Sequence, residues 1–174
     1  MHARAAAALL ACALLAAPAA AQRDSLRTQV VAAYPLHAAV HFLAAEYERT
    51  AGGSATLGVG AAYFALGRRD DVVRYAAVDV KARYYPGADP LRGVSLALTA
   101  GPSWLKFGDD YARNLRWARG VGIGAEVARS HLLGAEQRVH VGYGAGAKRL
   151  FWMDEVGAKV VVVPSVRLSV GYAY

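Results

Sequence analysis

The chain has 174 residues, and 20 lysines and arginines against 13 aspartates and glutamates give it a formal net charge of +7. Hydrophobic residues make up 56% of the sequence and charged residues 19%, which excludes an extended disordered chain, and the length suits a single domain. The sequence has 10 tyrosines and 18 glycines but only 4 phenylalanines and 2 methionines. This balance favours β-structure with aromatic residues at a water interface.

The first 21 residues have the pattern of a secretory signal peptide. Arg4 precedes an apolar run rich in alanine and leucine over residues 5–17, and small residues follow up to Ala21. The run is shorter than the roughly 20 strongly apolar residues that a membrane-spanning helix needs. We therefore predict that residues 1–21 are a signal peptide and that residues 22–174 form the exported domain. The only cysteine, Cys12, lies in the predicted signal, so we expect no disulfide in that domain.

After residue 22, apolar residues alternate with small or polar ones, and turn-forming residues interrupt the alternation. Val94, Leu96 and Leu98, for example, share one face of a strand, while Ser95 and Thr99 share the other. In chain order, the predicted strands cover residues 26–34, 38–49, 55–66, 72–85, 93–107, 116–131, 138–150 and 158–174. The first has the weakest pattern, but eight antiparallel strands place both chain ends on one side, as an exported barrel requires. The predicted fold is all-β: an eight-stranded antiparallel up-and-down transmembrane β-barrel.

Alternation alone does not orient the barrel, because a soluble lipid-carrying barrel turns its apolar face inward and a membrane barrel turns it outward. The polar face carries Arg27, Glu46, Glu48, Asp79, Lys81, Arg83, Glu126, His140, Lys148 and Arg167. On a soluble barrel these residues would form the solvated exterior. In a membrane barrel they would face inward, where four acids and five bases would neutralise one another. Eight strands enclose only enough room for side chains, so we favour such a network over a conducting channel.

The aromatic residues favour the membrane orientation. Near the predicted outer ends of the strands, the apolar face carries Tyr34, Tyr63, Trp104 and Trp117; near the inner ends it carries Tyr47, Tyr84, Tyr172 and Tyr174. Two aromatic girdles are typical of transmembrane barrels, and a soluble carrier has no need for both. Tyr75 is expected to face inward, and Tyr143 to lie at mid-height on the apolar face.

The final strand ends with apolar residues at every second position up to an aromatic C-terminus, over residues 166–174. This pattern is similar to the C-terminal signal by which bacterial outer-membrane barrels are recognised by their assembly machinery. The predicted exported domain as a whole resembles the small eight-stranded OmpA/OmpX-like barrels. It looks closest to an uncharacterised branch, on the motifs at Glu46 to Arg49, Arg83 to Pro86 and Pro164 to Leu168. The resemblance implies an outer-membrane barrel and no known reaction.

The sequence offers no convincing catalytic or metal site. A barrel deacylase of the lipid A type has its histidine and serine two residues apart on one strand face, and none of His37, His41, His131 and His140 has such a serine. Ser130 and His131 are adjacent and should point to opposite faces. Asp109 and Asp110 have no neighbouring serine for a palmitoyl transferase, and two histidines at 37 and 41 make a poor metal site. The glycines at alternate positions in 120–124 and 142–146 are expected to relieve crowding inside a narrow barrel.

These observations predict an integral protein of the bacterial outer membrane with a structural or surface-interaction role. We expect no catalysis, no cofactor, no metal and no nucleic-acid partner. The expected partners are outer-membrane lipids and lipopolysaccharide, together with the barrel assembly machinery during biogenesis, and we expect a monomer. The outer loops are placed near residues 67–71, 108–116 and 151–157. The alternative is a soluble periplasmic barrel that carries an apolar ligand.

Overall fold

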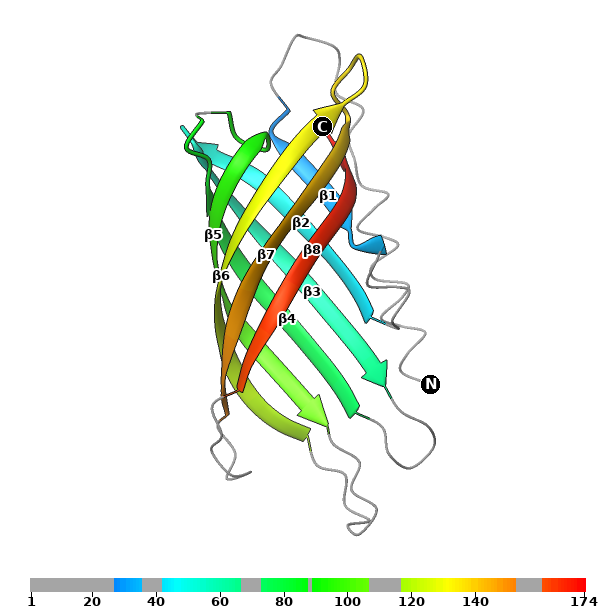
Figure 1. Ribbon diagram of the computed structural model, residues 1–174, viewed down its shortest axis with the longest axis vertical. Helices are drawn as coiled ribbons and strands as arrows, with labels where there is room; N and C mark the ends of the chain where they lie inside the picture. Colours follow the sequence, from blue (N-terminus) through cyan, green and yellow to red (C-terminus); the bar gives the residue numbers. More distant parts are fainter. Residues whose placement is uncertain (1–26, 36–41, 67–72, 88, 107–116, 153–160) are drawn as a thin grey trace.

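The computed structural model describes residues 27–35, 42–66, 73–87, 89–106, 117–152 and 161–174. Its strands are β1 (Gln29–Ala33), β2 (Phe42–Gly52), β3 (Ala55–Leu66), β4 (Val73–Tyr84), β5 (Gly93–Lys106), β6 (Trp117–Leu133), β7 (Val139–Trp152) and β8 (Val161–Ala173). All neighbouring strands are antiparallel, and β1 pairs with β8 to close the barrel (Figure 1). The predicted fold class is confirmed. Among the residues described, no helix is long and apolar enough to cross a membrane.

The strands lie close to the predicted ranges, with the largest differences at the first strand and at the end of the second, where β2 continues to Gly52, three residues beyond its expected end. β1 has only five residues, against the range 26–34 expected from the sequence. β6 is the longest strand and continues to Leu133, two residues beyond its expected end. The predicted beginnings of the second strand (38–41) and the eighth (158–160) lie outside the described residues.

The register with which β1 pairs with β8 determines the tilt of the strands relative to the barrel axis. Following directly opposite partners from Gln29 around the sheet leads through each strand in turn to Pro164 on β8. The backbone of Gln29, however, exchanges hydrogen bonds of 3.0 Å with Tyr174, which follows Pro164 by ten residues in the sequence. This offset inclines the strands to the barrel axis, as Figure 1 shows. Eight inclined strands enclose an interior that side chains can fill.

The side chains confirm that the apolar face of each strand from β2 to β8 points out of the barrel, whereas β1 is apolar on both faces. Leu98 is 67% exposed and Val166 71% exposed, whereas Ser95 and Ser169 are completely buried. The barrel therefore has the reverse of a soluble protein's polarity, with apolar side chains outside and polar ones inside.

The turn between β4 and β5 closes the inner end, the end at which the C-terminus lies (Figure 1). Leu91 in this turn is completely buried, and it packs with Val30, Ala32 and Ala173. Its φ of 68° lies in the left-handed region, which non-glycine residues seldom adopt. The apolar plug around Leu91 offsets that cost by removing apolar surface from water.

Candidate functional site in the barrel interior

Six charged side chains meet in the barrel interior, and all of them come from the even-numbered strands. Glu46 and Glu48 lie on β2, Lys81 and Arg83 on β4, Glu126 on β6 and Arg167 on β8. We call these six residues the interior network. It contains three acids and three bases, so its formal charges balance.

Small residues on the odd-numbered strands make room for the interior network. Glu46 is directly opposite Ala32 on one side and Gly60 on the other. Glu126 is opposite Ala97 and Gly146 in the same way. Because long side chains from one strand lie over small residues of its neighbours, the interior fills without crowding.

Glu46 is the most heavily bonded acid of the interior network. Its carboxylate accepts hydrogen bonds from Arg167 at 2.6 Å, Lys81 at 2.7 Å and Arg83 at 3.4 Å. The Tyr34 hydroxyl donates a fourth bond of 2.6 Å. A carboxylate has about four lone-pair sites, so these bonds satisfy the group.

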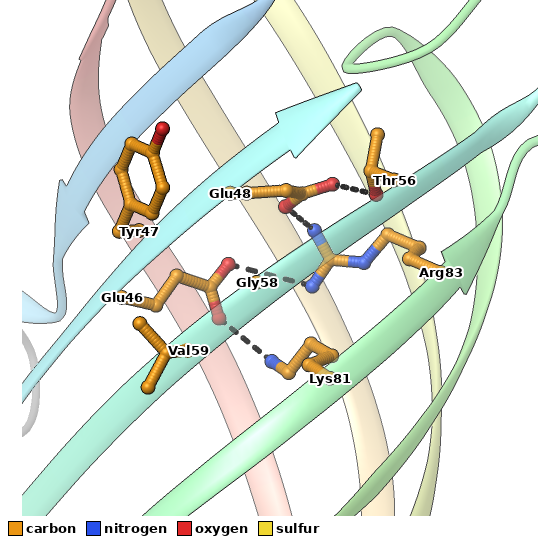
Figure 2. A pocket seen from close by; sticks show the side chains of 8 residues that line it. All are labelled: Glu46, Tyr47, Glu48, Thr56, Gly58, Val59, Lys81 and Arg83. Carbon is orange, nitrogen blue, oxygen red and sulfur yellow. Dashed lines mark hydrogen bonds and ion pairs between the residues drawn. The ribbon is translucent and has the colours of Figure 1, made fainter. Parts of the chain in front are cut away.

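Glu126 and Glu48 share the same cations. Glu126 lies 2.8 Å from Arg167, 3.1 Å from Arg83 and 3.5 Å from Lys81. Glu48 contacts Arg83 and accepts hydrogen bonds from Thr56 at 2.5 Å and Tyr85 at 2.8 Å. Figure 2 shows Arg83 between Glu46 and Glu48, with Lys81 reaching Glu46 from the same strand.

The Tyr85 hydroxyl is a reliable donor to this network. Burial raises the pKa of Tyr85 well above its ordinary value, and the negative charge of Glu48 raises it further. The phenol therefore stays protonated and can donate its hydrogen bond.

A second ion pair lies apart from the interior network. The Lys148 ammonium donates to the two Asp79 carboxylate oxygens at 2.7 and 2.9 Å, and to the Ser103 hydroxyl at 3.2 Å. A Cβ atom placed on Gly122 would lie 1.9 Å from Lys148 Cε. The glycine therefore provides the space that Lys148 occupies, which agrees with the sequence interpretation of the alternating glycines.

The ion pairs of the interior network join the four even-numbered strands across the barrel interior. The hollow beside the network is bordered by Glu46, Tyr47, Glu48, Thr56, Gly58, Val59, Lys81 and Arg83 (Figure 2). Each of the six charges has an oppositely charged partner, as buried charges require. The geometry thus suits a rigid, self-neutralised filling.

Two of the predicted orientations were wrong. Tyr34 was placed on the outward aromatic girdle, but its hydroxyl binds Glu46 and the Arg167 guanidinium lies 5.6 Å from its ring centre, so it faces inward. The backbone of Tyr34 continues the pairing with β2 through a 3.1 Å hydrogen bond to Ala44, and its side chain shares the inward face of β1 with the buried Val30 and Ala32. The two faces of the first strand were therefore predicted the wrong way round. Arg27 was expected inside, but it precedes β1 and bonds to the backbone oxygen of Glu136 in the β6–β7 turn.

The other aromatic predictions agree with the structure where the side chains are described. Tyr63, Trp117, Tyr84, Tyr143 and Tyr172 are all exposed on the outward face. Tyr75 faces inward as expected, because it approaches Ser103 at 3.4 Å and stacks on Phe64. The sequence did not single out Phe151, which joins the outward aromatics at the outer end.

His140 faces inward as expected, but its surroundings were missed. It is completely buried, and neither ring nitrogen has a protein hydrogen-bond partner. A Cβ on Gly142 would lie 3.1 Å from the His140 ring and 2.7 Å from Ser169 Oγ, so histidine and serine lie close together across strands. The two residues lie on different strands, β7 and β8, so residue spacing along a single strand does not reveal the pair. No described hydrogen bond joins His140 to a serine, which a nucleophile and its base would need.

Ser130 and His131 point to opposite faces, as predicted: Ser130 is completely buried, and His131 stacks on the outward Tyr143. His37, His41, Asp109 and Asp110 lie outside the described residues. So do most of the predicted outer loops. Within the described ranges, no group of three or more histidine, cysteine, aspartate or glutamate side chains is placed to hold a metal ion.

The fold and its interior define a class of protein: eight-stranded antiparallel barrels with an apolar exterior and an ion-paired interior. Among solved structures, the chain is similar to the N-terminal β-barrel domain of Pseudomonas aeruginosa OprF, with a TM-score of 0.52 and 7% sequence identity. The match covers 85% of this chain and 98% of that one. No protein-family model matches the sequence, and no curated protein matches it. At this identity the likeness shows a shared fold.

Proposed function

We propose that the protein is an integral outer-membrane barrel whose role is structural or interactive, and that it neither conducts ions steadily nor catalyses a reaction. The observation that carries this proposal is the reversed polarity of the barrel. Exposed leucines, valines and aromatic residues cover the outside of the barrel, and the inward-facing charged residues of the strands pair with one another. A bilayer core is the solvent that suits such an exterior.

The soluble carrier is less well supported by the same observation. A carrier of an apolar ligand needs an apolar cavity, because ligand pockets are lined mostly by hydrophobic side chains. Here the middle of the barrel holds three carboxylates and three cations within ion-pairing distance. An apolar ligand would have to separate those charges in order to enter.

Folding into lipid vesicles tests the membrane assignment. The chain without residues 1–21 is refolded into phospholipid vesicles and run on a denaturing gel, either unheated or after boiling. We expect a mobility shift on heating, because a folded membrane barrel resists the detergent until it is boiled. A protein that stays soluble without vesicles, shows no shift and binds an apolar dye inside the barrel would establish the carrier instead.

Planar bilayers test the closed interior separately. We expect no steady conductance from the inserted wild-type barrel, since the ion pairs of the interior network bridge the barrel between β2, β4, β6 and β8. Regular single-channel steps from the wild-type protein would refute the closed interior while leaving the membrane assignment intact.

A further inference from the structure

Along the described strands, the outward face of the barrel carries charge of one sign only. In the described strands all four acids, Glu46, Glu48, Asp79 and Glu126, belong to the interior ion pairs. The outward charges are all cations: Arg49, Arg74, Lys106, Arg119, Arg129 and Arg149. Four of them gather near the outer ends of the adjacent strands β4 to β7, and we call Arg74, Lys106, Arg119 and Arg149 the outer basic patch.

Two cations of the patch are directly opposite each other in the sheet. Arg74 on β4 is the ladder partner of Lys106 on β5. Residues opposed in this way have Cβ atoms about 5 Å apart, and like charges there destabilise the sheet. A bound anion that contacts both side chains would remove this repulsion.

Tryptophans beside the outer basic patch indicate its depth in the membrane. Lys106 is opposite Trp117, and Arg119 is opposite Trp104, so cations and indole rings alternate on two neighbouring strands. The Lys106 ammonium lies 5.9 Å from the centre of the Trp117 ring. Tryptophan prefers the boundary between the hydrocarbon and the lipid headgroups, so these cations lie at headgroup level. On β7, Arg149 lies over the ring of Phe151 in the same way, at 4.8 Å.

We propose that the outer basic patch binds the phosphate groups of a phosphorylated glycolipid in the outer leaflet, with Arg74 and Lys106 as the central contacts. Arginine and lysine are the side chains that bind phosphate, and the guanidinium of Arg74 can do so through two parallel hydrogen bonds. The exposed apolar residues of the strands below the patch would lie against the acyl chains of the same lipid. This inference rests on the proposed membrane location.

The test compares two variants that lose the same charge. Arg74→Gln/Lys106→Gln removes the centre of the patch, and Arg49→Gln/Arg129→Gln removes two outward arginines on β2 and β6 that lie outside it. Each refolded protein is titrated in detergent micelles with lipid A that carries two phosphates and with the same lipid after dephosphorylation. Both lipids carry brominated acyl chains, and quenching of the indole fluorescence of the protein by these chains reports binding.

We expect the wild type and Arg49→Gln/Arg129→Gln to bind the phosphorylated lipid at least tenfold more tightly than the dephosphorylated one. Arg74→Gln/Lys106→Gln should lose that preference, and equimolar inorganic phosphate should not compete. An unchanged preference in Arg74→Gln/Lys106→Gln, or an equal loss in both variants, would overturn the proposal. If the double substitution prevents folding, Lys106→Gln alone is used, with Arg129→Gln as its control.

The mobility shift on heating is recorded for the same samples. A heat-modifiable barrel without a phosphate preference would refute the lipid site alone. A chain that shows no heat-modifiable form in vesicles would refute the membrane location, and the lipid site with it.

Discussion

Glu126 shows how closely the interior residues depend on one another. Its carboxylate lies within ion-pairing distance of Lys81, Arg83 and Arg167, and two of these cations also bind Glu46 as their closest carboxylate. Removing one acid therefore leaves a surplus cation that cannot be solvated inside the barrel. Breaking a buried ion pair in this way costs more than replacing both partners with apolar groups.

We predict that Glu126→Leu lowers the free energy of unfolding by about 3 kcal/mol, because three cations then share two carboxylates. The measurement is urea unfolding in lipid vesicles, followed by tryptophan fluorescence. Adding Lys81→Met to Glu126→Leu restores the charge balance and should recover part of the loss. If Glu126→Leu is as stable as the wild type, the interior charges do not act as a coupled network.

Two inward glycines should respond differently to a methyl group. A Cβ on Gly101 would lie 1.9 Å from the backbone oxygen of Val78, which cannot move without disturbing β4. A Cβ on Gly60 would make only ordinary contacts, the nearest at 3.6 Å from the backbone oxygen of Ala45. The two positions thus separate crowding from the general effect of replacing glycine.

We expect Gly101→Ala to destabilise the barrel by more than 1 kcal/mol, as overpacking commonly does. Gly60→Ala should be neutral or stabilise it by up to about 1 kcal/mol, since alanine reduces the freedom of the unfolded chain. Urea midpoints in vesicles compare the two. Equal midpoints would show that the interior tolerates the added methyl group and that the close packing described for β4 and β5 is absent.

At the scale of a strand, depth in the bilayer should decide the effect of a charge on the outward face. Leu96 on β5 is opposite Tyr84 of the inner aromatic girdle, whereas Leu98 lies two residues closer to mid-height. An arginine near the bilayer midplane costs about 2–4 kcal/mol, and near an interface about 0–1 kcal/mol. The two positions share one strand and one face, so the difference between them isolates depth.

We predict that Leu98→Arg destabilises the barrel by about 2 kcal/mol more than Leu96→Arg does. Unfolding in vesicles of defined thickness measures both values. Equal stability of the two variants would contradict the assigned position of the bilayer along β5.

The sequence could predict the strands and their faces because alternation is a local signal. Leu98 and Thr99 differ in burial simply because successive residues on a strand point to opposite faces. On the first strand the same rule was applied with the faces reversed, because β1 is apolar on both faces and gives the alternation no polar side. Tyr34 therefore faces inward with Val30 and Ala32. The buried turn residues Tyr85 and Leu91 were not singled out, because a turn has no periodicity that marks which side chain folds inward.

At the scale of the whole molecule, the contacts of the interior network depend on how the sheet closes. Arg167 and Glu46 are 121 positions apart in the sequence, and they meet only because β8 and β1 close the barrel with a fixed offset. Apart from Arg27, the sequence predicted which charges face inward and that acids and bases nearly balance, but not which pairs form. That information lies in the register of eight strands, which a one-residue shift would change throughout.

Closure depends on the last residues of the chain. Tyr172 pairs with Val31, and the backbone of Tyr174 exchanges hydrogen bonds with Gln29. We predict that deleting residues 172–174 prevents assembly, because β1 would lose most of its partners on β8 and two strand edges would be left open. The conservative variant Tyr172→Phe/Tyr174→Phe keeps both rings and the backbone and should assemble normally. The heat-modifiable, membrane-embedded fraction measures this outcome, and normal assembly of the deletion would contradict it.

The proposed membrane location requires the apolar face of the barrel to lie in lipid, and a cysteine scan of β5 tests this most directly. Cys12 is the only cysteine and lies within residues 1–21, so a spin label can be attached at single cysteines introduced one at a time over residues 94–100. In lipid vesicles, we predict that collisions with oxygen, which concentrates in the bilayer, are frequent at Val94, Leu96, Leu98 and Ala100 and rare at the positions between them. Frequent collisions at Ser95, Ala97 and Thr99 instead, or no alternation at all, would contradict a transmembrane barrel with its charges inside.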